Sequence, residues 1–107
     1  MGFTVFPIKV IYRFTALSHA VPLQATVSVS SRNFKKAVDR NRIKRQLREV
    51  YRLQKLPLQQ KLDTGKNQLA LFFIYTGKVL PEYQDLFDKM AKILDRLTNM
   101  VHPDNTL

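Results

Sequence analysis

The chain has 107 residues, with 18 basic residues against 8 acidic ones and a formal net charge of +10. It contains no cysteine, which excludes disulfides, cysteine-ligated zinc, iron–sulfur clusters and a thiol nucleophile. Hydrophobic residues make up 45% of the chain, and no apolar run approaches the ~20 residues of a transmembrane helix. We therefore expect a single domain over residues 1–107, its core within about residues 5–100, whose charge favours a polyanion, nucleic acid before acidic membrane.

Three segments have the composition of β-strands. Ile8–Phe14 and Leu23–Val29 alternate at period two, which predicts two strands that pair antiparallel to each other. Leu69–Tyr75 is apolar at nearly every position, which predicts a central strand covered on both faces.

The segment from about Phe34 to Gln54 contains neither proline nor glycine and predicts a helix. Asn33 or Ser31 is the expected N-cap, because both side chains can accept a hydrogen bond from the first helical turn. Pro57 interrupts the helical pattern, and Asp63–Lys66 predicts a turn.

Near the end of the chain, apolar residues recur at three- and four-residue steps from Tyr83 to Met100, which predicts an amphipathic helix. The expected order is therefore β-β-α-β-α. The fold class is α+β, a small sheet packed with a basic helix and a C-terminal amphipathic helix, with the last strand in the same sheet.

The positive charge is concentrated between Arg32 and Lys55, where ten basic residues face two acidic ones for a net charge of +8. Helical periodicity separates this segment into an apolar side and a basic side. The apolar side consists of Ile43, Leu47, Val50 and Tyr51, and the opposite side of Asn41, Arg45, Arg48 and Arg52. The second set spans about 17 Å at 1.5 Å per residue, enough for several successive phosphates.

Such a helix can be an ordinary solvated face, but two acids cannot neutralise ten bases, and like charges four residues apart disfavour a helix. The planar guanidinium group also suits phosphate, because it can donate two parallel hydrogen bonds. The candidate phosphate-binding residues, and hence the candidates for binding a nucleic acid such as RNA, are Arg32, Lys35, Lys36, Arg40, Asn41, Arg42, Lys44, Arg45, Arg48 and Arg52.

Residues 37–52, AVDRNRIKRQLREVYR, resemble the characteristic helix of the bacterial ribonuclease P protein subunit family. That family carries Arg-Asn-Arg, then Lys-Arg, then Arg-Glu and a further Arg at this spacing. The resemblance covers about residues 5–100 and implies the ribosomal protein S5 domain 2-like fold with a left-handed β-α-β crossover. The family's opening helix has no counterpart at the start of this sequence, so we expect an uncovered part of the sheet and self-association through it.

The resemblance implies a protein cofactor of ribonuclease P in the bacterial cytoplasm. The catalytic RNA subunit would remove the 5′ leader of precursor tRNA, with Mg²⁺ held mainly by RNA and substrate. The basic helix would bind that RNA, and a cleft between sheet and helix would hold the leader. The candidate cleft residues are Tyr12, Phe14, Ser28 and Ser30, although Tyr12 and Phe14 also suit a core.

No pair of histidines and no carboxylate cluster suggests a protein active site, so we assign no catalytic and no metal-binding residue. Two other functions remain open. A ribosomal-type RNA-binding protein would explain the charge but not the motif. A membrane-surface helix would need a bulkier apolar side than this one has.

Overall fold

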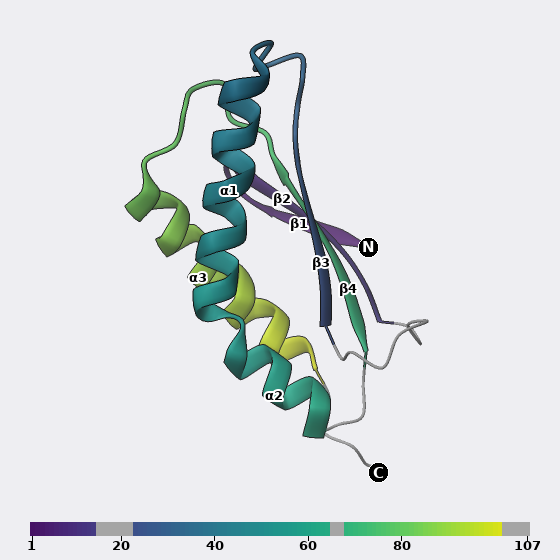
Figure 1. The fold of residues 1–107 in the computed structure, drawn as a ribbon. Helices are drawn as coiled ribbons and strands as arrows, with labels where there is room; N and C mark the ends of the chain where they lie inside the picture. Colours follow the sequence, from purple (N-terminus) through teal and green to yellow (C-terminus); the bar gives the residue numbers. More distant parts are fainter. Residues whose placement is uncertain (15–22, 65–67, 102–107) are drawn as a thin grey trace.

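The computed structural model describes residues 1–14, 23–64 and 68–101, which form one sheet with helices on one side of it (Figure 1). The strands are β1 (Gly2–Val5), β2 (Ile8–Phe14), β3 (Leu23–Val29) and β4 (Leu69–Tyr75). The helices are α1 (Ala37–Gln54), α2 (Leu56–Thr64) and α3 (Tyr83–Met100). The α+β class and the placing of the last strand in the same sheet are as predicted.

The strand order is β1-β2-β4-β3, so β4 lies inside the sheet as its apolar sequence predicts. β2 pairs antiparallel with β1 and with β4, whereas β3 pairs parallel with β4. The predicted antiparallel pairing of β2 with β3 is therefore wrong. Two neighbouring parallel strands need a long crossover connection, and α1 and α2 supply it between β3 and β4.

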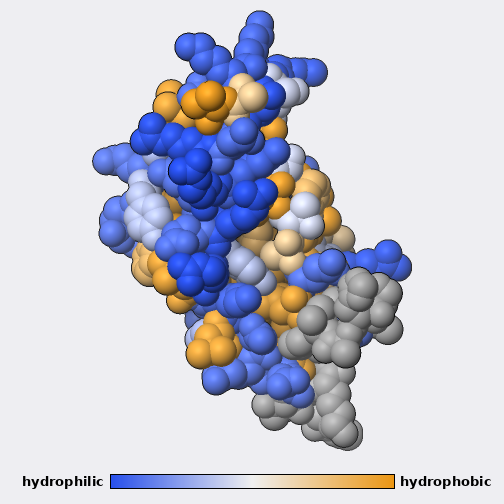
Figure 2. Space-filling view, viewed as in Figure 1, coloured by the Kyte–Doolittle hydropathy of each residue, from blue (hydrophilic) through white to orange (hydrophobic). Residues whose placement is uncertain are grey.

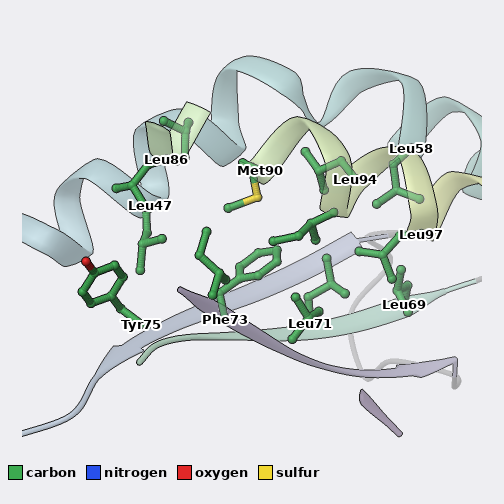
Figure 3. Packing of buried hydrophobic residues seen from close by; sticks show 14 of the residues in the cluster. Leu47, Leu58, Leu69, Leu71, Phe73, Tyr75, Leu86, Met90, Leu94 and Leu97 are labelled. Carbon is green, nitrogen blue, oxygen red and sulfur yellow. The ribbon is translucent and has the colours of Figure 1, made fainter. Parts of the chain in front are cut away.

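The core lies between the helices and one face of the sheet (Figure 3). Side chains of α1 and α3 pack against every second residue of β2 and β4, because successive residues of a strand point to opposite faces of the sheet. The largest fully buried side chains are those of Tyr75, Phe73, Ile8, Ile43, Leu47, Leu58, Leu62, Leu69, Leu86, Met90, Ile93 and Leu97.

The described residues place no helix on the other face of the sheet (Figure 1). On this uncovered face, Ile11 of β2 lies opposite Phe72 of β4, and the two side chains are 39% and 36% exposed. The prediction that Leu69–Tyr75 is covered on both faces is therefore wrong for the part of the chain that is described. Self-association through this face stays a prediction.

Helix α1 begins at Ala37, later than the predicted start near Phe34. The Phe34 side chain is buried, with its ring centre 5.9 Å from that of Tyr75, and the Asn33 amide donates to carbonyls beyond the end of β4. These contacts hold both residues beside the end of β4, ahead of the helix, and neither Asn33 nor Ser31 is the N-cap. The N-cap is Lys36, whose side chain makes no capping hydrogen bond.

Two further elements are absent from the sequence-based prediction. The helical pattern is interrupted at Lys55, just before Pro57, as predicted, but a second helix follows at once and has Pro57 as its second residue, where a missing N–H costs little. Asp63, expected in a turn, lies in that helix, and residues 65 and 66 of the expected turn lie outside the described residues. The four-residue strand β1 is too short for periodicity to indicate it.

The two leucines Leu47 and Leu53 of α1 allow a matched test of the core. Leu47 is fully buried and Leu53 is 51% exposed. We expect Leu47→Ala to lower the free energy of unfolding by about 2–5 kcal/mol, since it leaves a cavity. Leu53→Ala should change it by less than about 1 kcal/mol. Urea unfolding followed by circular dichroism measures both, and equal effects would contradict this placing of the helix.

Candidate nucleic-acid interface

Helix α1 has the two sides that its sequence predicts. Ile43, Leu47 and Val50 are fully buried against the sheet, while Arg45 and Arg48 project outward. Figure 2 shows hydrophilic side chains along the outer side of α1 and over its N-terminal end. One amphipathic helix therefore supplies part of the core and a continuous basic surface.

Most of the bases on this surface have no partner within the protein. Neither a hydrogen bond nor an ion pair joins them to any of the described residues, and all but the half-buried Lys44 are exposed. Their charges therefore repel one another and remain available to an external anion. These unpaired bases are Arg32, Lys35, Lys36, Arg42, Lys44, Arg45 and Arg48.

Other predicted binding residues are engaged differently. Arg52 makes an exposed ion pair with Glu49 one turn before it, with Nη2 at 2.9 and 3.0 Å from the two carboxylate oxygens. Arg40 folds back and donates to two backbone carbonyls at the start of the helix. Asn41 is exposed, and its amide makes no hydrogen bond to a described residue.

A groove separates α1 from the edge strand β3. Its volume is about 210 Å³, and Tyr51 and Arg48 line it on the helix side while Ala25, Thr26 and Val27 line it on the strand side. The ring centre of Tyr51 lies 5.5 Å from that of Phe73, so the inner part of the Tyr51 side chain packs against the core. Burial raises the pKa of the Tyr51 phenol above its ordinary value. A cleft between sheet and helix was expected, but Tyr51 was assigned to the core, and the strand residues that line the groove were not among the predicted cleft residues.

The structure does not bring the four candidate cleft residues together. Tyr12 packs against the core on the helix-covered face, with the exposed Phe14 ring 6.0 Å from it. Ser28 lies on the opposite face, in register with Ile74, because successive residues of a strand point to opposite faces. Ser30 follows β3, and its carbonyl accepts a hydrogen bond from the next segment of the chain.

The described residues also bear on metal and membrane binding. Among residues 1–14, 23–64 and 68–101, histidine and carboxylate side chains nowhere gather in threes close enough to hold a metal ion. Of the helices in these ranges, none combines the length and the apolar character needed to cross a bilayer.

Comparison with known proteins identifies the family of the chain. A sequence profile of the family Ribonuclease P matches residues 3–98. The chain belongs to the ribonuclease P family. The Ribonuclease P protein component of Porphyromonas gingivalis is 34% identical over 100 residues, which are 94% of this chain and 73% of that protein. The one from Chlorobaculum tepidum is 42% identical over 62 residues, which are 54% of this chain and 40% of that protein.

A solved structure of the family has the same fold. The RNase P protein from Thermotoga maritima, in complex with 1-(4-fluorophenyl)-2-thiourea, superimposes with a TM-score of 0.65 over 90% of this chain and 84% of that one. Since the two sequences are 18% identical, this likeness concerns the fold alone. The predicted membership of the ribonuclease P family and the predicted α+β class are confirmed.

The buried phenol of Tyr51 predicts a loss of stability at alkaline pH. In the unfolded chain a tyrosine ionises near pH 10, whereas burial holds the folded Tyr51 neutral to a higher pH. The contribution of the neutral Tyr51 phenol to the free energy of unfolding is therefore fully present below about pH 10. It is lost as the pH rises from there towards the pKa of the folded state.

Urea unfolding between about pH 9 and 11 measures this loss. We expect the free energy of unfolding to fall less steeply in Tyr51→Phe than in the parent chain. Tyr83→Phe, which removes an exposed phenol from α3, is the matched control and should leave the slope unchanged. Parallel curves for Tyr51→Phe and the parent would contradict the assigned burial.

Proposed function

We propose that this member of the ribonuclease P family acts as the protein cofactor of the enzyme, binding the catalytic RNA and the precursor tRNA. The observation that carries the proposal is the surface of unpaired bases on the outer side of α1 and its preceding loop. A fold that leaves these charges without internal partners gains most from a polyanion laid along them.

The helix suits a phosphate backbone in both spacing and chemistry. Arg42, Arg45 and Arg48 follow one another at three-residue steps, about 4.5 Å apart along the helix axis. Each exposed guanidinium can donate a forked pair of hydrogen bonds to phosphate oxygens. Binding by this surface is therefore mainly electrostatic, and it releases counterions from the RNA.

The 5′ leader of the precursor fits the groove between α1 and β3. The groove lies between helix and sheet, and Arg48 stands at its margin as a phosphate ligand. The half-buried Tyr51 ring offers a surface against which an unpaired base can pack. This groove takes the place of the cleft expected around Tyr12 and Ser28, which lie on opposite faces of the sheet.

The protein's part in the reaction is binding and charge neutralisation. Its described residues do not fit a Mg²⁺ site, because acidic ligands do not cluster and the candidate surface is basic. We assign the Mg²⁺ ions and the hydrolytic chemistry to the RNA subunit and its substrate. The protein's bases lower the repulsion between those two polyanions, which favours their association when Mg²⁺ is scarce.

Cleavage of a precursor tRNA by a bacterial ribonuclease P RNA at low Mg²⁺ tests this function. Added protein should raise the cleavage rate, because it supplies the cationic charge that Mg²⁺ supplies at high concentration. Protein without RNA should give no cleavage. An RNA–protein complex that forms but gains no rate would instead support a general RNA-binding protein, and sustained cleavage by RNA-free protein would contradict the proposal.

The salt dependence of RNA binding tests where the surface lies. If it neutralises about five to seven phosphates, log K against log salt should have a slope of roughly −4 to −6. Arg45→Ala should make that slope shallower by about one unit, since one phosphate contact is lost. Asn41→Ala should lower affinity by about 1 kcal/mol and leave the slope unchanged, because the amide is uncharged.

Lys92→Ala is the matched control for Arg45→Ala. Lys92 is an exposed base of α3 and, like Arg45, makes no ion pair with a described residue. It should leave both affinity and slope close to those of the parent. Equal losses in the two variants, measured by filter binding over a salt series, would show that the surface is misplaced.

A further inference from the structure

The connection between β3 and α1, residues 30–36, is hereafter the basic loop. It carries the exposed bases Arg32, Lys35 and Lys36. Such long side chains on an irregular segment ordinarily lose much conformational freedom when they bind. Here the backbone beneath them is attached to the rest of the protein at two places.

The first attachment joins the basic loop to the end of β4. The Asn33 amide Nδ2 lies 3.3 Å from the carbonyl oxygens of both Thr76 and Gly77. Beside it, the buried Phe34 ring packs against Tyr75, whose hydroxyl donates to the carbonyl of Val79 at 2.7 Å. The middle of the loop is therefore held by the sheet.

The second attachment joins the basic loop to α1 through Arg40. Its Nη1 donates to the carbonyl oxygen of Phe34 at 2.7 Å and to that of Lys35 at 2.9 Å. A charged donor makes stronger hydrogen bonds than a neutral one, and a guanidinium fixes their direction. Donation from one nitrogen to two successive carbonyls holds the Arg40 guanidinium against the loop backbone.

We propose that Arg40 is a positioning residue for RNA binding, which holds the basic loop on α1 so that Arg32, Lys35 and Lys36 continue the surface of Arg42. This inference rests on the proposed RNA-binding function. It gives two arginines two residues apart different roles. Arg42 is exposed and has no partner among the described residues, so it contacts the RNA, while Arg40 orders the bases that do.

A double-mutant cycle separates these roles while keeping every charge on the helix. Arg40→Lys and Arg42→Lys each retain a positive charge, but a lysine cannot reproduce the guanidinium geometry at Arg40. Each of the two substitutions is made in the parent chain and in a triple variant that lacks the loop bases (Arg32→Ala, Lys35→Ala and Lys36→Ala). Binding to the ribonuclease P RNA is measured for all of them by filter binding.

We expect Arg40→Lys to weaken binding about fivefold in the parent and less than twofold in the background without loop bases, since residues of one network are coupled. Its salt slope should match the parent's, because no charge is lost. Arg42→Lys should have the same effect in both backgrounds. If Arg40→Lys weakens binding by the same factor with and without the loop bases, as Arg42→Lys is expected to do, the proposal is overturned.

Amide hydrogen exchange tests the loop attachment without RNA. The Phe34 N–H bonds the Ser30 carbonyl at 3.2 Å within the basic loop. Arg40→Lys should speed exchange at Phe34 at least tenfold and leave the core amide of Leu47 unchanged. Unchanged exchange at Phe34 overturns the proposal, whereas faster exchange at both sites shows general destabilisation and also overturns it.

The two assays distinguish the failure of this inference from that of the proposed function. If removal of the three loop bases and Arg45→Ala both leave RNA affinity unchanged, the proposed RNA surface is wrong, and the positioning role falls with it. If those variants weaken binding while Arg40→Lys shows no coupling, the RNA surface stands and Arg40 alone is misassigned.

Discussion

The parallel pairing of β3 with β4 is the constraint on which the rest of the architecture depends. Neighbouring parallel strands cannot be joined by a hairpin, so the chain between them must leave the sheet, cross one of its faces and return. The crossing segment must bury an apolar stripe against that face, and α1 does so with Ile43, Leu47 and Val50. Its opposite side is left facing outward, and there the bases lie. The topology therefore makes the outer side of the crossover helix the candidate binding surface.

The basic helix gains little stability from interactions among its own residues. Its bases are mostly unpaired, its N-cap makes no side-chain hydrogen bond, and the Arg52–Glu49 ion pair is exposed and therefore weak. Tertiary contacts hold it instead, and they include the Gln54 amide, which donates to the Phe87 carbonyl of α3 at 3.1 Å. A substitution deep in the core would therefore weaken the proposed RNA binding without replacing a basic residue.

The sequence predicted those features that depend on periodicity within one element. The buried and basic sides of α1 follow from 3.6 residues per turn, and the interior position of β4 follows from its apolar composition. Strand partners could not be predicted in the same way, because period two reveals which residues share a face but not which strand lies alongside. The late start of α1 escaped prediction because Phe34 is buried by a residue far along the chain, Tyr75.

The candidate site was predicted to the same extent and for the same reason. The bases of α1 lie where the helical period put them, whereas the cleft set combined Tyr12 with Ser28 from two strands whose relative placement was unknown. Strand β4 separates these two strands, and the two side chains emerge on opposite faces. The groove beside Tyr51 depends on how closely α1 approaches β3, which no local pattern encodes.

The basic surface comes almost entirely from one uninterrupted stretch of chain, residues 32–52. Surfaces assembled from distant segments disperse when a protein unfolds, but this one keeps its charge density in the denatured chain. The proposed RNA ligand would therefore bind the unfolded as well as the folded polypeptide. Ligand-linked stabilisation depends on the difference between those two affinities, so saturating RNA would raise the melting temperature less than the folded-state Kd alone implies. On the proposed function, a newly made chain would engage RNA electrostatically before its sheet has formed, and the RNA would relieve the repulsion that opposes helix formation.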